Sequence, residues 1–226
     1  VTYKLFSYFS RVNYNLKQKY FLSGLIRRDA SSRFSKENRW GTFYSASIGW
    51  RIDKDFFKNN DIIDQWKLRI SYGAVGNQEI PDFAYLERIN SGYQYPFGYA
   101  PQEGYATYKL GNKDVQWETS NQIDIGTDIF LFNDKFDISI DYYYKTTDNL
   151  LLSVSLPSSA GYAGSPIINT GKILNTGLEL TIGYRKYYSD DFSYYIKANG
   201  ALLHNKMLEL DNPILAGRID NGVYAT

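Results

Sequence analysis

Long segments in which apolar and polar residues alternate are the feature that most constrains the fold of this chain. In the stretch KFDISIDYYYK (135–145), every even position from 136 to 144 is apolar or aromatic, while Asp137, Ser139 and Asp141 occupy odd positions. Successive side chains of a β-strand point to opposite faces, so this pattern predicts a strand with one apolar and one acidic face. A soluble sheet with one solvated face shows the same alternation. Strand length and connection length must therefore decide whether the sheet is soluble or lies in a membrane.

Eight segments share this alternation. They lie at approximately 3–14, 19–30, 42–52, 65–76, 117–132, 135–150, 172–187 and 192–206. Strands of globular proteins are usually about 5–6 residues long, whereas strands that cross an outer membrane need about 9–11. The polar positions carry too many charges for a packed protein interior. In a transmembrane barrel, the apolar face meets lipid on the outside and the polar face meets a water-filled or plugged lumen on the inside, so both faces are satisfied. We therefore predict an all-β chain that forms an antiparallel transmembrane β-barrel segment, with one short helical stretch at 53–65.

The connections between these segments support the same prediction, because short and long connections alternate. The short turns lie at 15–19, 132–135 and 187–192, and the long linkers lie at 31–41, 77–116 and 151–171. Outer-membrane barrels carry short turns at one end and longer loops at the other. A soluble sandwich has no physical reason to sort its loops in this way.

Aromatic residues make up 17% of the chain, and many lie near the predicted strand ends. Such positions are typical of the aromatic girdles at the two membrane interfaces, although the strand propensity of Tyr and Trp gives a similar distribution. The predicted girdle residues are Trp40, Phe43, Trp50, Trp66, Trp117, Tyr142, Tyr143, Tyr144, Tyr187, Tyr188, Tyr194 and Tyr195.

Composition also bears on chemistry and partners. A net charge of +1, from 25 basic and 24 acidic residues, gives no electrostatic basis for a nucleic-acid partner. The chain has no Cys and a single His, His204, which excludes disulfides, thiolate metal sites and two-His metal sites within it. No GxSxG motif is present. We therefore expect no enzyme activity, no catalytic residues, no cofactor and no bound metal.

The long linker at 77–116 carries the candidate ligand-contacting residues in SGYQYPFGYAPQEGYATY. Aromatic faces stack on sugar rings or contact peptide side chains, and tyrosine hydroxyls add orienting hydrogen bonds. The alternative is that these rings pack within the loop or against a partner that covers it. The candidate residues are Tyr93, Tyr95, Phe97, Tyr99, Tyr105 and Tyr108.

Several stretches together resemble the SusC/RagA family of TonB-linked outer-membrane transporters. The residues that carry the resemblance lie at 20–52 (YFLSGLIRRDASSRFSKENRWGTFYSASIGWRI), 68–80 (LRISYGAVGNQEI), 114–162 and 169–185 (NTGKILNTGLELTIGYR). The resemblance implies about eight strands of a larger, roughly 22-stranded plugged barrel in the outer membrane of a Gram-negative bacterium. Residues 1–226 are then part of the C-terminal transmembrane β-barrel domain, and the plug, the N-terminal domain and the closing strands are absent from them.

The resemblance also implies a function and partners. It implies a TonB-dependent receptor that imports a glycan or a peptide nutrient, with a SusD-like surface lipoprotein above the barrel, the TonB complex reached through the plug region, and outer-membrane lipid around it. The charged residues of the polar face are then expected to form salt bridges to the plug or to line the lumen in water. Two alternatives remain open: an outer-membrane barrel with a structural or secretion role, and a soluble β-sandwich that binds carbohydrate.

Overall fold

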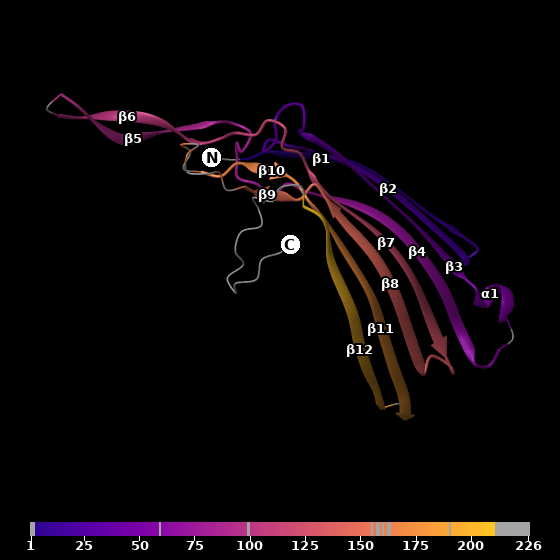
Figure 1. The fold of residues 1–226 in the computed structure, drawn as a ribbon. Helices are drawn as coiled ribbons and strands as arrows, with labels where there is room; N and C mark the ends of the chain where they lie inside the picture. Colours follow the sequence, from indigo (N-terminus) through magenta and orange to yellow (C-terminus); the bar gives the residue numbers. More distant parts are fainter. Residues whose placement is uncertain are drawn as a thin grey trace.

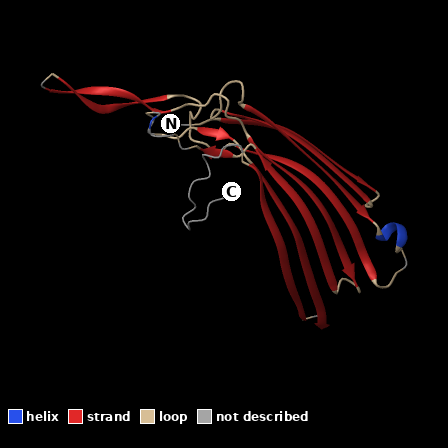
Figure 2. Cartoon of the chain, viewed as in Figure 1, coloured by secondary structure: helices blue, strands red, loops and turns tan. Residues whose placement is uncertain are grey.

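The computed structural model describes residues 3–58, 60–98, 100–154, 156, 159, 161, 164–189 and 191–210. Its main element is a curved antiparallel sheet with the strand order β1-β2-β3-β4-β7-β8-β11-β12 (Figures 1 and 2). The strands are β1 (Leu5–Leu16), β2 (Tyr20–Ser31), β3 (Trp40–Arg51), β4 (Ile63–Asn77), β7 (Glu118–Leu131), β8 (Phe136–Asp148), β11 (Lys172–Ser189) and β12 (Phe192–Glu209). The eight predicted strands are thus confirmed, with ends that shift by a few residues.

The registers show that the predicted apolar positions share one face of this sheet. Ile140 of β8 lies opposite both Thr127 of β7 and Leu180 of β11. Ile140 and Leu180 are 38% and 41% exposed, so no second layer of the described structure covers them. A soluble β-sandwich buries this face in a core between two sheets. The alternative of a soluble β-sandwich is therefore not supported.

Tight turns and one short helix lie at the end of the sheet that we call the turn end. The helix α1 (Asp53–Phe56) is a single turn, so the predicted helical stretch 53–65 is too long. The Asn60 side chain accepts hydrogen bonds from the N–H groups of Ile62 and Ile63, which bends the chain into the start of β4. Within the described part of the chain, no helix has both the length and the apolar character needed to cross a membrane.

Two carboxylates fix α1 against the strands. Asp53 accepts hydrogen bonds from the Arg51 guanidinium, at 2.7 and 2.6 Å, and from the backbone N–H of Trp66 at 3.0 Å. Burial raises the pKa of Asp53, but these hydrogen bonds outweigh it and leave the pKa below its ordinary value. Asp55 pairs with Lys19 of the β1–β2 turn. One short segment thereby ties together the ends of four strands.

The two longest connections, at the opposite end, contain strands that the sequence did not predict. Residues 77–116 include a hairpin of β5 (Arg88–Phe97) and β6 (Ala100–Lys109). Residues 151–171 include β9 (Leu151–Ser153) and β10 (Ile167–Asn169), which also pair. We call this end the loop end. Glycines and prolines interrupt the apolar–polar alternation in these segments, so the alternation does not predict their strands. Proline is nevertheless tolerated in a strand that has an unpaired edge.

The buried core lies at the loop end, where three long connections meet β3. Its buried members are Phe34, Phe43, Ile80, Ala84, Val115, Trp117 and Ile167. Phe43 and Trp117 are only 7% and 8% exposed, and their rings meet edge to face at 5.5 Å. The Phe43 ring lies over Gly41 and Gly76, where an added Cβ would come within 2.6 and 2.0 Å of its Cζ. The assignment of Phe43 and Trp117 to an interfacial girdle is therefore wrong.

Other predicted girdle residues do form a band on the apolar face at the turn end. Adjacent rings in this band have centroids 4.8 to 6.2 Å apart. The contacting pairs are Trp50–Phe56, Phe57–Trp66, Phe132–Phe136, Phe136–Tyr184, Tyr184–Tyr194 and Tyr188–Tyr194.

Three predicted girdle tyrosines instead belong to the polar face. The Tyr195 hydroxyl donates a hydrogen bond to Asp137 at 2.8 Å, and the Tyr143 ring lies over Gly177. Tyr187 pairs with Ser193 and shares the face of Tyr195. The alternation rule places all three residues on the polar face, and the girdle assignment of these three is wrong because it uses only their position near a strand end.

Candidate functional site

The β5–β6 hairpin carries most of the candidate ligand-contacting residues, and it extends away from the eight-stranded sheet (Figure 1). Tyr93, Tyr95 and Phe97 occupy alternate positions of β5 and therefore share one face of the hairpin. Their partners on β6 are Gly104, Gln102 and Ala100. An added Cβ at Gly104 would lie 3.1 Å from the Tyr95 ring, so the missing side chain leaves room for that ring. The structure thus brings three of the six candidates into one row.

The remaining candidates do not join this row. Tyr105 faces the side opposite the aromatic row, because its neighbour Gly104 pairs with Tyr93. A bulge at Gly92, which has a φ of +96°, then lets Tyr105 pair with Ser91. Tyr108 lies near the hairpin base, where its carbonyl accepts a hydrogen bond from the N–H of Gly164 at 2.7 Å. Tyr99 lies outside the described residues.

The rings of the row are exposed and are not parallel. Phe97 is 72% exposed, and the Tyr95 and Phe97 rings lie 6.5 Å apart with an angle of 69° between their planes. Consecutive sugar rings stack best on aromatic rings that lie flat in one plane. The Tyr95 and Phe97 rings instead meet edge to face, the arrangement that contacting aromatic side chains prefer.

An ion cluster occupies the middle of the polar face. The Arg69 guanidinium of β4 binds Asp128 through two hydrogen bonds of 2.7 and 2.9 Å and reaches Asp141 of β8 at 2.9 Å. The Ser139 hydroxyl lies within hydrogen-bonding distance of both carboxylates, at 2.9 and 3.0 Å, and can donate to either one. Gly126 lies beneath the guanidinium, and a Cβ there would come within 2.1 Å of an Asp141 oxygen. Arg69 thus pairs with two carboxylates of the wall itself.

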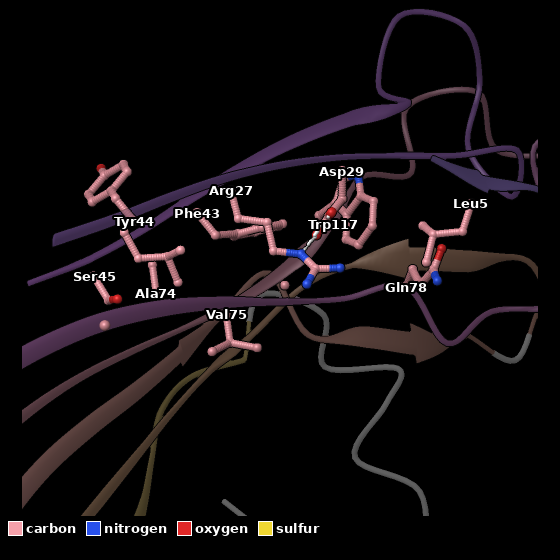
Figure 3. A pocket seen from close by; sticks show the side chains of 13 residues that line it. Leu5, Arg27, Asp29, Phe43, Tyr44, Ser45, Ala74, Val75, Gln78 and Trp117 are labelled. Carbon is pink, nitrogen blue, oxygen red and sulfur yellow. Dashed lines mark hydrogen bonds and ion pairs between the residues drawn. The ribbon is translucent and has the colours of Figure 1, made fainter. Parts of the chain in front are cut away.

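A cavity of about 450 Å³ lies at the loop end, between β3 and β4. Leu5, Arg27 and Val75 line it, as do the edges of Phe43 and Trp117 (Figure 3). The sequence alone did not identify this cavity, because its walls come from five separate segments of the chain. Among the described residues, no group of three or more His, Cys, Asp or Glu side chains is arranged to hold a metal ion.

Comparison with known proteins identifies the family. The family model for the β-barrel of TonB-dependent receptor-like proteins matches residues 1–219. The chain is 37% identical over 213 residues to the TonB-dependent receptor SusC of Bacteroides thetaiotaomicron, which covers 91% of this chain and 21% of SusC. It is 36% identical over 210 residues to the TonB-dependent receptor P39 of Formosa agariphila, covering 92% of this chain and 20% of that receptor.

Comparison with solved structures supports the same family. The structure of the RagAB peptide transporter superposes with a TM-score of 0.83 and 29% identity, over 92% of this chain and 23% of the matched chain. The chain spans about a fifth of the length of the curated relatives it matches.

The family explains the two faces of the sheet. The apolar face, with Ile140 and Leu180, points to lipid, and the polar face, with Arg69, points to the lumen, as in other outer-membrane barrels. The chain therefore belongs to the TonB-dependent receptor family, related to SusC and RagA, and forms an eight-stranded part of a transmembrane β-barrel in the Gram-negative outer membrane.

Proposed function

We propose that this chain is part of a receptor that imports a glycan or peptide nutrient across the outer membrane, with energy supplied through TonB. The observation that carries the proposal is the match of the family model to residues 1–219, together with 37% identity to SusC. One solved relative, RagAB, is a peptide transporter. The long loops lie at one end of the sheet, which is where such a receptor meets its ligand.

Residues 1–226 are then part of the C-terminal barrel domain of a longer polypeptide, which supplies the plug, the N-terminal domain and the closing strands. Two observations support this proposal. The chain spans about a fifth of its relatives. In addition, β1 and β12 each pair on one side only within the described structure. Unpaired backbone N–H and C=O groups in lipid cost several kcal/mol each, so both edges need partner strands.

The aromatic row of the hairpin is proposed to contact a SusD-like surface lipoprotein above the barrel, or the ligand beneath that lipoprotein. An isolated two-stranded hairpin is only marginally stable in water. The row of Tyr93, Tyr95 and Phe97 leaves large apolar surfaces exposed, which favours a covering partner. The tilt between the rings favours contact with a protein surface over stacking on successive sugars.

The contact can be tested by co-purification of the full-length receptor with its lipoprotein from outer membranes. Replacing Tyr95 and Phe97 together with alanine is expected to reduce the recovered lipoprotein at least tenfold, because exposed aromatic anchors dominate such interfaces. Tyr105→Ala is the matched control, since Tyr105 is equally exposed but lies on the other face. Equal recovery from the double variant and the control would show that the row does not bind the lipoprotein.

Import itself is tested in cells. A strain that lacks the full-length receptor is expected to lose growth on the nutrient that wild-type cells take up, and a strain that lacks TonB is expected to show the same loss. Growth that persists in both strains would exclude import and favour a structural or secretion role for the barrel. Candidate nutrients are purified glycans and peptides supplied as the sole carbon source.

A further inference from the structure

A single charged side chain lies on the lipid-facing side of β1, β2 and β3. Leu22 of β2 pairs with Ile48 of β3, which also lies opposite Ile70 of β4, so these strands continue the lipid face of the sheet. Arg28 follows Leu22 by six residues in β2 and therefore points to the same side. Every other lipid-facing position of these three strands, which the structure describes in full, holds an uncharged residue. Charged residues are costly in lipid, so a charge at such a position indicates a function.

The position of Arg28 along β2 places its guanidinium at the outer edge of the apolar band. Tyr20, at the start of β2, pairs with Trp50 of the aromatic band at the turn end. Arg28 follows Tyr20 by eight residues, which correspond to about 20 Å along the membrane normal at a rise of about 3.3 Å per residue and a tilt of about 40°. The apolar band is about 25 Å tall, so the Arg28 Cα lies about 5 Å inside its loop-end edge, within reach of the long side chain. Long loops of such barrels are extracellular, so this edge belongs to the outer leaflet.

Aromatic rings hold the guanidinium at this edge. The Arg28 carbon Cζ lies 5.0 Å from the centroid of the Trp40 ring, and Trp40 pairs with Ala30, which is two residues closer to the loop end. The arginine side chain therefore bends toward the loop end. Phe6 and Tyr8 of β1 also contact Trp40, with ring centroids 6.2 and 5.9 Å from its own. Aromatic rings of this kind are typical of the level of the lipid headgroups.

The charge of Arg28 has no carboxylate partner among the described residues. Arg28 takes part in none of their ion pairs, whereas the neighbouring Arg27, on the lumen side, pairs with Asp29 at 2.8 Å. The residues directly opposite Arg28 are Tyr8 of β1 and Thr42 of β3, so a residue with a hydroxyl group flanks it on each side. This arrangement suits a phosphate group, which accepts two hydrogen bonds from a guanidinium and further ones from hydroxyl groups.

We propose that Arg28, with Tyr8, Thr42 and Trp40 around it, binds the phosphate group of a lipid in the outer leaflet. Two observations favour a membrane lipid over a free anion. The positive charge of Arg28 complements the phosphate, and the site continues into the apolar face of β1, β2 and β3, against which the acyl chains of the lipid would lie. The inference depends on the position of the sheet in the membrane and not on the proposed import function.

The test uses the full-length receptor in detergent and lipid A that carries its phosphate groups, with affinities measured by native mass spectrometry. Arg28→Gln is expected to weaken binding at least tenfold, because it removes the charge-assisted hydrogen bonds to phosphate. Arg28→Lys keeps the charge but loses the forked geometry, so its affinity should lie between those of wild type and Arg28→Gln. Equal affinities of Arg28→Gln and wild type would overturn the site.

Arg11→Gln is the matched control. Arg11 lies in β1 opposite Leu25, on the lumen side, and is exposed. Its replacement also removes one arginine from the same edge of the sheet, but it is expected to leave the affinity for lipid A unchanged. Equal losses in Arg11→Gln and Arg28→Gln would assign the effect to net charge and would overturn the site.

Two further ligands identify the group that is bound. Lipid A without its phosphate groups is expected to bind the wild-type receptor at least tenfold more weakly. Equal binding of the two lipids would show that the acyl chains alone are recognised and would overturn the role of phosphate. Inorganic phosphate in large molar excess is expected not to displace lipid A, because it lacks acyl chains. Displacement would indicate a site for free anions and would overturn the assignment to a lipid.

Melting temperatures separate a lipid site from a structural role of Arg28. The lost cation–π contact with Trp40 and the removed cost of a charge near the interface are of similar size, so Arg28→Gln should melt close to wild type in lipid-free detergent. Added lipid A should raise the melting temperature of wild type and of Arg11→Gln more than that of Arg28→Gln. A lower melting temperature of Arg28→Gln without lipid, together with unchanged affinity for lipid A, would show that Arg28 pairs within the full-length polypeptide and would overturn the proposal.

Discussion

Replacement of Leu180 by arginine tests the assignment of the two faces directly. Leu180 lies in β11, opposite Ile140 of β8, and its side chain points to lipid. Tyr184, in the aromatic band at the turn end, is four residues along the strand in one direction. Thr176, which lies opposite Tyr144, is four residues along in the other.

These positions place Leu180 near the middle of the bilayer. A strand rises about 3.3 Å per residue and tilts about 40° in such barrels, so four residues correspond to about 10 Å along the membrane normal. The apolar band of an outer-membrane barrel is about 25 Å tall, and half of it is about 12 Å. Arginine on the lipid face at the midplane costs about 2–4 kcal/mol. Leu180→Arg should therefore lower the folding equilibrium constant by a factor of about 30 to 900.

The assay is refolding of the complete receptor from urea into phosphatidylcholine vesicles, with the folded fraction read from its heat-dependent mobility on a gel. The matched control is Thr181→Arg, on the neighbouring residue. Thr181 faces the lumen opposite Ser139 and Asn199, so the new guanidinium stays in a polar environment. We expect the control to change the free energy of unfolding by no more than about 0.5 kcal/mol. Equal effects of the two substitutions, or a larger effect of Thr181→Arg, would refute the assignment of the faces.

Two further predictions concern the polar face and the turn end. Gly126→Ala is expected to displace the Asp141 carboxylate, which would lie 2.1 Å from the new Cβ, and so to weaken its ion pair with Arg69 at a cost of about 1 kcal/mol or less, because the pair is partly exposed. Gly24→Ala, with nothing within 4 Å of its Cβ, should cost nothing. Thermal unfolding in detergent compares the two variants, and equal melting temperatures would contradict the displacement. Asp53 has a lowered pKa in the folded state, so its stabilising contribution is present at neutral pH and is lost as the pH falls below about 4. Asp53→Asn should therefore lower the melting temperature at pH 7 and flatten its dependence on pH between about 5 and 3. An unchanged acid dependence in that variant would assign the loss of stability to other carboxylates.

The eight long strands and the face of each residue followed from the sequence, because the two-residue period of a strand is a local property. Ile140 and Leu180, for example, were placed on the apolar face by alternation alone, and the register confirms that they are neighbours. The alternation of short and long connections indicated which end of the sheet carries the tight turns and which end carries the long loops. The family resemblance rested on motifs spread along the same strands, and the family model confirms it.

The candidate site was only partly predictable. Sequence reasoning identified the aromatic residues of 77–116 but not the hairpin that they form. Tyr105 faces away from Tyr93, Tyr95 and Phe97 because the hairpin register pairs Tyr93 with Gly104, the neighbour of Tyr105. A register shifted by one residue would bring Tyr105 to the face of the row, and the alternation within each strand does not fix the register between two strands.

The sequence by itself therefore determined the eight long strands, their two faces and the membrane that one face requires. The tertiary structure alone decided that Phe43 and Trp117 form a core, that Arg69 pairs within the wall, and that a cavity opens where β3 and β4 separate. The physical reason is distance along the chain. Alternation is set by adjacent residues, whereas each of these features needs contacts between segments that are tens of residues apart and meet only when the sheet has formed.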